Sequence, residues 1–316
     1  MIPSPSEPQA PDPRPPVSGP RSITVHAHAK INLELRVTGA RPDGFHELET
    51  VFQAIELHDT LRCERGEGPF RIACDAPGVP TGPANLIWRA ADALWRHLGR
   101  DGEPAGAVVA VEKRIPIQAG LGGGSADAAA ALVGLASLWD AEVDAVALAR
   151  VAAGIGSDVA FFLTGGTALG FGRGERLVPL PDLAPHWVVL VRPAFGVSTA
   201  EAYRWYDAAA PADGRAAVAR LDGSWTLGLG PIRNDLEGPV AARHPEIRAA
   251  RAALLAAGAR AAGLSGSGSA VFGLFEGREA AERAMAQVDP GGLRFPWAHL
   301  TRTRPRGGPS GLPGSG

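Results

Sequence analysis

The sequence predicts an α+β protein of two domains, and three observations support this prediction. The chain has 316 residues, about twice the length of a typical domain. Apolar residues occupy every second position from Ile23 to Val37, which is strand periodicity. Later strands and helices mix without the regular alternation of a doubly wound sheet. We expect an N-terminal domain over residues 22–182 and a C-terminal domain over residues 183–303, divided after Pro179-Leu-Pro181.

Both ends of the chain have a composition that opposes folding. Prolines crowd the first residues, and no apolar segment of a signal peptide accompanies them. The last residues are rich in Pro, Gly and Ser. We therefore predict disordered segments over residues 1–21 and 304–316.

Between these ends, the pattern predicts elements in a definite order. A turn at Arg41-Pro-Asp-Gly44 follows the first strand. In the first domain we then expect a strand (50–57), a helix (85–98), a strand (108–111), an Ala-rich helix (125–139), a helix (143–151) and a strand (167–172). In the second domain we expect a strand (187–191), helices (199–206, 245–257, 279–288) and a Gly/Ser loop with an apolar strand (261–275).

Composition excludes several classes of function. The net charge is −2 and the pI is about 6.5, so no basic field attracts a nucleic acid. No apolar run approaches the roughly 20 residues of a membrane span. Cys63 and Cys74 have no metal-ligand spacing and no further cysteine to pair with, which favours a reducing cytoplasm.

Lysine is rare in this chain. Lys and Arg together number 31, but only Lys30 and Lys113 are lysine. A bias that replaces lysine by arginine wherever any cation suffices makes the two survivors candidates for a specific role, with chance survival as the alternative.

A glycine-rich loop over residues 116–127 is the most informative stretch. Its four glycines between Gly120 and Gly124 let backbone N–H groups approach a ligand, and a helix expected from Ser125 offers its positive end. Ser125 and Asp127 could cap that helix or contact a nucleotide-bound Mg²⁺. The loop is neither a Walker A nor a dinucleotide motif, and its alternative reading is a flexible linker.

A second glycine segment over residues 265–270, Ser-Gly-Ser-Gly-Ser-Ala, leads into an apolar strand. Alone it is a weak signal that also fits a turn. The chain has no Gly-x-Ser-x-Gly motif, which disfavours a serine hydrolase.

Three stretches in this order resemble the motifs of the GHMP kinases: Ala29-Lys-Ile-Asn32, the loop over 116–127, and the segment over 265–270. The resemblance extends over residues 23–302. It implies a ribosomal-protein-S5-like N-terminal domain, a ferredoxin-like C-terminal domain and an active site in the cleft between them. ATP with Mg²⁺ is the implied cofactor, with Mg²⁺ carried mainly by the phosphates.

Further segments resemble the members of this family that act on a cytidine diphosphate derivative of methylerythritol, in the methylerythritol phosphate route to isoprenoid precursors. They are Arg41-Pro-Asp-Gly-Phe-His-Glu-Leu48, Asn85-Leu-Ile87, Ile155-Gly-Ser-Asp-Val-Ala-Phe-Phe162 and Asn234-Asp-Leu-Glu237. The implied reaction is phosphorylation of the 2-hydroxyl. Another small-molecule kinase of the family, such as a homoserine kinase, is the first alternative. A non-enzymatic nucleotide sensor is the second, although it would be expected to lack Lys30 or Asp158.

The resemblance implies that Asp158 is the catalytic base and that Lys30 stabilises charge at the reacting hydroxyl. Without it, Asp158 reads as a helix N-cap and Lys30 as a surface lysine. The implied ATP-binding residues are Asn85, Lys113, Pro116, Ile117, Gln118, Ala119, Gly120, Leu121, Gly122, Gly123, Gly124, Ser125 and Ala126.

The implied substrate-binding residues are Asn32, Phe45, His46, Tyr203, Ser265, Gly266 and Ser267. Phe45 would stack on cytosine, His46 would bond its edge, and Tyr203 would offer a second face, with Trp205 and Tyr206 as alternatives. Without the resemblance, Phe45 reads as a core residue and His46 as a loop histidine. We expect a small-molecule partner, neither nucleic acid nor membrane, and a monomer or homodimer. His26 and His28 share a strand face but lack a third ligand, so we expect no protein metal site.

Overall fold

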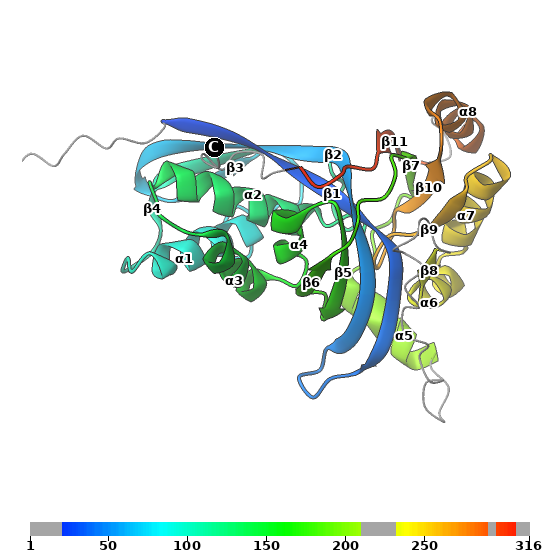
Figure 1. Cartoon of the computed structure of the whole chain (residues 1–316), viewed down its shortest axis with the longest axis horizontal. Coiled ribbons are helices and arrows are strands. Elements are labelled where there is room, and N and C mark those ends of the chain that lie inside the picture. The colour runs from blue at the N-terminus through cyan, green and yellow to red at the C-terminus, as the bar shows by residue number, and fades with distance from the viewer. Residues whose placement is uncertain (1–20, 210–231, 290–294, 308–316) are drawn as a thin grey trace, which may run out of the picture.

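The N-terminal half is organised around one long antiparallel hairpin of β1 (Ser22–Ala40) and β2 (His46–Pro69). The computed structural model describes residues 21–209, 232–289 and 295–307. Every second residue from Val25 to Val37 is buried, so the alternation that predicted the first strand is confirmed. The predicted turn at Arg41–Gly44 lies at the hairpin tip, at the bottom of Figure 1.

The hairpin forms the middle of the larger sheet. Among the described residues, this sheet has 7 strands in the order β3-β4-β2-β1-β8, and β5 and β6 extend it from β2. The added strands are β3 (Arg71–Cys74), β4 (Ala105–Glu112), β5 (Thr167–Gly172), β6 (Arg176–Pro179) and β8 (Arg233–Asn234).

The helices of this half gather around α2, which packs against β1 and β2 (Figure 1). They are α1 (Leu86–His97), α2 (Gly123–Leu138), α3 (Ala145–Ile155) and α4 (Val159–Thr164). Most side chains of α2 are buried, which explains why it is apolar on all sides rather than along one stripe.

The second half has a smaller antiparallel sheet of 4 strands in its described residues, in the order β11-β7-β10-β9. Its strands are β7 (Trp187–Arg192), β9 (Ala261–Leu264), β10 (Val271–Phe275) and β11 (Trp297–Arg302). The helices α7 (Pro245–Ala256) and α8 (Arg278–Val288) pack on this sheet. The helices α5 (Thr199–Ala209) and α6 (Glu237–Arg243) lie near the lower part of the hairpin in Figure 1.

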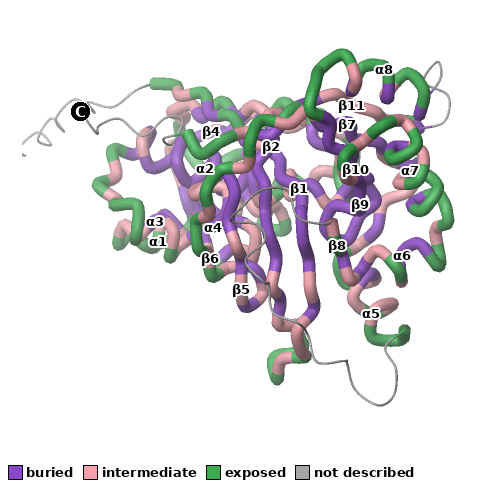
Figure 2. Tube along the Cα trace, turned by 45° about the vertical axis from the view of Figure 1, so that its right-hand side comes forward, coloured by how far each residue is buried: buried purple, intermediate pink, exposed green. Residues whose placement is uncertain are grey.

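The two halves share packing and backbone pairing. Ile31 and Leu33 of β1 belong to one buried cluster with Leu190 and Phe272 of the smaller sheet. β8 follows α5 in the chain, yet it pairs in parallel with β1. Figure 2 shows the buried residues running along β1 and β2 and on into the smaller sheet. The predicted α+β class is confirmed.

Several short elements escaped prediction. β3, β6, β8, β11, α4 and α6 have between 2 and 7 residues, too few for a periodic pattern to stand out. The Ala-rich helix starts at Gly123 instead of Ser125, and its N-cap is Gly122 without a side-chain bond. Of the two alternatives for Ser125 and Asp127, the one in which they cap this helix is therefore wrong.

The C-terminal segment makes contacts with the rest of the protein further along the chain than its composition predicted. The Arg304 N–H donates to the Ala54 carbonyl at 2.8 Å, and the Arg306 N–H donates to Asp182 Oδ2 at 2.7 Å. The predicted disorder from residue 304 is therefore wrong as far as Arg306. The rest of that tail (308–316) and residues 1–20 of the Pro-rich segment lie outside the described residues.

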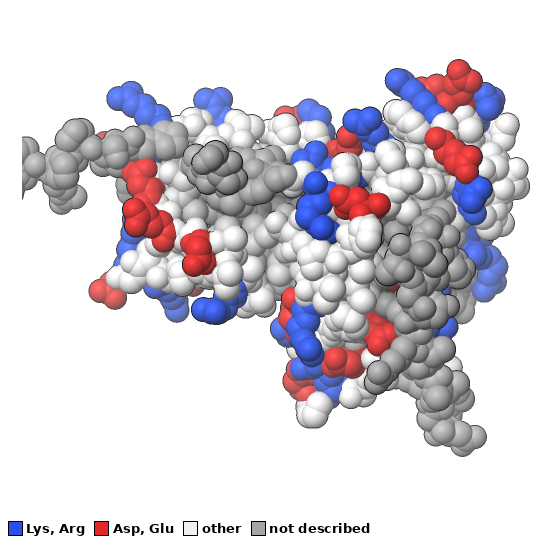
Figure 3. Space-filling model, in the orientation of Figure 1, with Lys and Arg blue, Asp and Glu red and all other residues white. Residues whose placement is uncertain are grey.

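The surface carries charges of both signs. On the face drawn in Figure 3, Lys and Arg side chains are interspersed with Asp and Glu side chains. Within the described residues, no helix combines the length and the apolar character that crossing a membrane requires.

Candidate active site

A cavity of about 1050 Å³ lies where the predicted motifs meet. Its walls come from β1, the hairpin tip, the first glycine loop, the start of α5 and the second glycine loop. Of the residues predicted to form the site, all but Ala126 and Ser265 line this cavity. Residues scattered over most of the chain are thus brought together by the fold.

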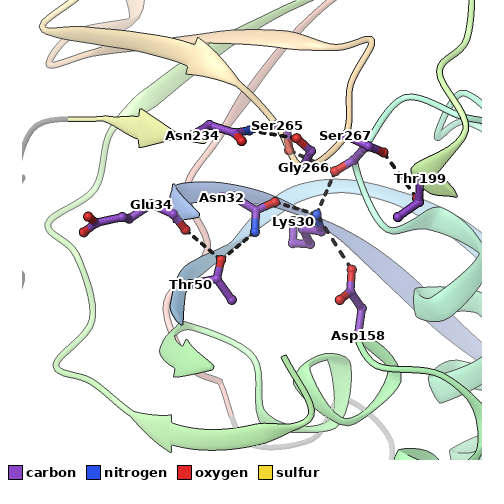
Figure 4. A network of polar contacts seen from close by, with 11 residues as sticks. Lys30, Asn32, Glu34, Thr50, Asp158, Thr199, Asn234, Ser265, Gly266 and Ser267 are labelled. Atoms are coloured by element: carbon purple, nitrogen blue, oxygen red, sulfur yellow. Dashed lines mark hydrogen bonds and ion pairs between the residues drawn. The ribbon is translucent and has the colours of Figure 1, made fainter. Parts of the chain in front are cut away.

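The three motifs meet at one backbone carbonyl. The Gly120 oxygen accepts a hydrogen bond from Lys30 Nζ at 2.7 Å and another from Ser265 Oγ at 2.9 Å. Lys30 also donates to Asn32 Oδ1 at 2.7 Å, as Figure 4 shows. Because Lys30 is only 3% exposed, these bonds hold its amine in one position within the cavity wall.

Asp158 faces this amine. Its Oδ2 lies 3.8 Å from Lys30 Nζ, and Figure 4 shows the two groups pointing toward each other. Asp158 occupies the N-cap position of α4 but makes no capping bond, so its carboxylate stays available to the cavity. Burial lowers the pKa of Lys30, while the attraction of Asp158 opposes that change.

A second chain of bonds fixes Asn32. Its Nδ2 donates to Thr50 Oγ1 at 2.8 Å, and that hydroxyl donates to the Glu34 carbonyl at 2.7 Å. Both polar ends of the Asn32 amide are therefore engaged, one by Lys30 and one by Thr50. Thr50 was not predicted, because its role depends on strand pairing and has no local signal in the sequence.

The first glycine loop leads directly into α2. Gly122 has a φ of 75°, and a Cβ there would lie 2.5 Å from the Phe162 ring. A Cβ on Gly123 would lie 2.9 Å from Ile115. The first turn of α2 contains no acidic residue, so its free N–H groups and positive end can receive an anion.

Lys113 lies beneath this loop between two carboxylates. Its amine donates to Asp127 Oδ2 at 2.7 Å and also to Asp59. Asp59 is fully buried and accepts the Ile115 N–H at 2.8 Å. Burial raises the pKa of Asp127 to about 7, and its Oδ1 has no partner among the described residues. Asp59 was not predicted, because 54 residues separate it from Lys113 in the sequence.

Aromatic side chains gather at the hairpin tip. Phe45 is 53% exposed and lines the cavity, so it is not the core residue of the alternative interpretation. His46 stacks on Tyr203 with ring centroids 4.7 Å apart, and its Nε2 lies 2.8 Å from Asp207 Oδ1. Tyr203 reaches the cavity.

Trp205 and Tyr206, the two alternatives to Tyr203, do not line the cavity. Trp205 packs against His244, with ring centroids 5.7 Å apart. Tyr206 meets His46 edge-on at 6.2 Å. The structure therefore places Tyr203 alone of the three in the cavity wall.

The second glycine loop has a mainly structural set of bonds. Ser265 is fully buried, and Asn234 Nδ2 donates to the Gly266 carbonyl at 2.7 Å. Ser267 does line the cavity and lies 3.3 Å from the Thr199 hydroxyl. Asn85, which also lines the cavity, caps α1 by accepting the Ile87 N–H at 2.8 Å.

The histidine pair predicted on β1 gains a third member. His58 of β2 stacks on His26 with centroids 4.4 Å apart and lies 5.1 Å from His28. Burial lowers the pKa of His28 to about 4, with nearby Arg304 as the next cause. Even so, the described residues contain no group of three or more His, Cys, Asp or Glu side chains arranged to hold a metal ion.

Two family models match this chain. The model described as the GHMP kinases N terminal domain matches residues 85–166, and the model described as the GHMP kinases C terminal matches residues 216–290. The first match contains the glycine loop and Asp158. Lys30, Asn32 and the hairpin tip lie outside both matches.

Full-length relatives extend the match. A 4-diphosphocytidyl-2-C-methyl-D-erythritol kinase of Moorella thermoacetica is 43% identical over 288 residues, covering 89% of this chain and 99% of its own. One of Pelotomaculum thermopropionicum with the same name is 44% identical, covering 84% and 93%.

Solved structures agree with these relatives. A crystal structure of a 4-(cytidine 5'-diphospho)-2C-methyl-D-erythritol kinase matches with a TM-score of 0.72 and 38% identity, covering 89% of this chain and 99% of its own. A homoserine kinase from Cytophaga hutchinsonii matches with a TM-score of 0.65 at 18% identity, covering 91% and 96%, which shows a shared fold alone.

Proposed function

This chain belongs to the 4-diphosphocytidyl-2-C-methyl-D-erythritol kinases of the GHMP kinase family, and we infer that it phosphorylates 4-diphosphocytidyl-2-C-methyl-D-erythritol with ATP. We propose the 2-hydroxyl as the acceptor, so that the products are the 2-phosphate and ADP. This step belongs to the methylerythritol phosphate route to isoprenoid precursors, and we propose that it takes place in the cytoplasm.

One observation carries the chemical proposal. Lys30 and Asp158 face each other at 3.8 Å in a cavity that has the glycine loop among its walls and aromatic residues at the hairpin tip. The N–H groups of the loop would bind the ATP phosphates. Phe45 and Tyr203 would hold the cytosine. The reacting hydroxyl of the substrate would then lie between the ATP phosphates and the cytosine, beside Asp158.

The transfer can be followed atom by atom. The hydroxyl oxygen of the substrate forms a bond to the γ-phosphorus, and the bond from that phosphorus to the β–γ bridging oxygen breaks, releasing ADP. The hydroxyl proton passes to a carboxylate oxygen of Asp158. The buried amine of Lys30 stabilises the negative charge that gathers on the transferring group and the attacking oxygen.

Magnesium would enter with the nucleotide. Mg²⁺ keeps several water ligands and needs only one or two protein oxygens beside those of the phosphates. The Ser125 hydroxyl and the Asp158 carboxylate line the cavity and fit that requirement. When bound, the ion would neutralise phosphate charge.

The proposal is tested by ADP release with Mg·ATP and 4-diphosphocytidyl-2-C-methyl-D-erythritol, beside homoserine. We expect turnover on the cytidyl compound alone, with kcat about 10²–10⁴-fold lower in Asp158→Asn. Asp144→Asn is a matched control, because Asp144 only caps α3 and asparagine caps equally well. Turnover on homoserine instead would favour another kinase of the family. ATP binding without turnover on either compound would favour a nucleotide sensor.

A further inference from the structure

Of the described Lys and Arg residues that line the cavity, Arg173 is the one whose charge is not paired with a carboxylate. It lies in the turn between β5 and β6 and lines the cavity. Among the described residues, its guanidinium makes no ion pair. The backbone N–H of Arg173 donates to Glu175 Oε2 at 2.6 Å, which fixes the turn without engaging the side chain.

Every other Lys or Arg that lines the cavity has an acidic partner. Lys30 faces Asp158, and Lys113 is bound by two carboxylates. Arg204 lies 3.6 Å from Glu201. Arg173 is attracted electrostatically to Asp43, but that carboxylate is itself paired with Arg41 at 3.2 Å. Arg173 therefore remains available to an anionic ligand.

The turn that carries Arg173 joins the two ends of the cavity. The guanidinium carbon of Arg173 lies 5.0 Å from the centre of the Phe45 ring. On the other side, a Cβ placed on the adjacent Gly174 would lie only 3.8 Å from Asp158 Oδ1. The turn that carries Arg173 thus contacts the aromatic group proposed for the base and also approaches the carboxylate proposed for the hydroxyl.

The substrate has its own charge at the matching place. A diphosphate links its cytidine to its methylerythritol, so with the base at Phe45 and the hydroxyl at Asp158, the diphosphate must pass between them. A guanidinium offers a planar fork of donors that suits phosphate oxygens better than an ammonium does. Its contact with the Phe45 face orients that fork before the substrate binds.

We propose that Arg173 binds the diphosphate of the cytidyl substrate and sets the preference for a nucleoside diphosphate over an uncharged nucleoside. The proposal rests on the proposed function and deepens it. Arg173 contributes to binding and takes no part in the transfer of the phosphoryl group itself.

The test compares Arg173→Gln and Arg173→Lys with wild type. By ADP release, we expect Arg173→Gln to raise the KM for the cytidyl substrate by about 10- to 100-fold, as for loss of a charged hydrogen bond. The KM for ATP should stay within about twofold, since the glycine loop is untouched. Arg173→Lys should recover part of the loss. Arg176→Gln, an exposed position of the same hairpin, should behave as wild type.

A binding measurement separates the diphosphate from the base. Calorimetric titration with CDP and with cytidine should show CDP weakened by about the same 10- to 100-fold in Arg173→Gln, and cytidine within about twofold of wild type. Equal weakening of both ligands would overturn the proposal, because Arg173 would then act only through Phe45. Unchanged CDP binding would also overturn it. A wild type that releases no ADP on the cytidyl substrate would instead contradict the proposed function, which the two titrations do not use.

Discussion

The carbonyl oxygen of Gly120 accepts the hydroxyl of Ser265 at 2.9 Å, and this bond ties together two glycine loops that lie 145 residues apart. The two loops can approach each other this closely because Gly120 has no side chain. A Cβ there would lie 2.0 Å from the Ser265 carbonyl oxygen, and its φ of 74° also disfavours any other residue. The same carbonyl holds Lys30, so the junction connects both loops to the proposed catalytic amine.

Gly120→Ala is therefore expected to destabilise the protein by about 1–3 kcal/mol and to weaken ATP binding, because a backbone contact must open. Thermal unfolding and calorimetric ATP titration measure the two effects. Gly154→Ala is the matched control. A Cβ on Gly154 meets nothing within 4 Å, so that change in α3 should stabilise by about 0.5–1 kcal/mol. A Gly120→Ala protein as stable as wild type would refute the tight junction.

Phe45→Ala is expected to raise the KM for the cytidyl substrate by about 5- to 150-fold, the range that corresponds to the loss of one stacked base. Phe45 is 53% exposed, so its truncation should change the melting temperature little. Steady-state ADP release provides the KM, and Phe45→Tyr, which keeps the ring, should remain near wild type. An equal rise in the KM for ATP would contradict a role confined to the cytosine.

The part of the fold that could be predicted depends on local pattern. The alternation along β1 and the apolar pattern of the helix expected over residues 85–98 depend on neighbouring residues, and both elements were predicted. The pairing of β8 with β1 could not be predicted in this way. The two residues of β8 carry no periodicity, and their partners in β1 lie about 200 positions earlier. The ordered Arg304 and Arg306 were missed for a related reason, since composition says nothing of the carbonyl and carboxylate that receive them.

The same distinction separates the site residues that were predicted from those that were not. Lys30, Asn32 and the glycine loop belong to continuous motifs, so the sequence alone predicted them. Asp59 and Thr50 act on those motifs from β2, and only strand pairing brings them near. A cap at Asp127 was one of two predicted alternatives, because Asp127 falls in the first turn of the helix expected from Ser125. In the structure α2 begins earlier, and Asp127 accepts a hydrogen bond from Lys113 instead.

The two cysteines are expected to differ in reactivity. Cys63 is fully buried against α2, where a Cβ on Gly134 would lie 2.6 Å from its sulfur, and burial raises the pKa of its thiol to about 12. Cys74 at the end of β3 is half-buried. A thiol reagent such as DTNB should therefore label one cysteine in the folded protein and both in urea. In Cys74→Ser, the folded protein should show almost no labelling; rapid labelling there would contradict the packing of Cys63.

Asp127 is expected to make stability depend on pH. Burial raises its pKa from 3.8 to about 7, so between these values the folded protein holds a proton that the unfolded chain has lost. The stabilisation is complete below about pH 4, and it is lost as the pH rises through about 7. Lys113, whose pKa is raised, stays charged across this window and adds no slope.

Asp127→Asn should remove this slope while keeping a hydrogen bond to Lys113. Urea unfolding at pH 5 and pH 8 measures this slope. The quantity compared is the difference in free energy of unfolding between variant and wild type, and how that difference changes between the two pH values. Wild type should lose on the order of 1–3 kcal/mol relative to Asp127→Asn, since one pKa unit is worth about 1.4 kcal/mol. Groups such as His28 titrate equally in both proteins and cancel. Asp144→Asn, at an exposed cap, should show no such change. A difference between Asp127→Asn and wild type that stays constant with pH would mean that Asp127 is already ionised at pH 5, held in that state by Lys113 against the effect of burial.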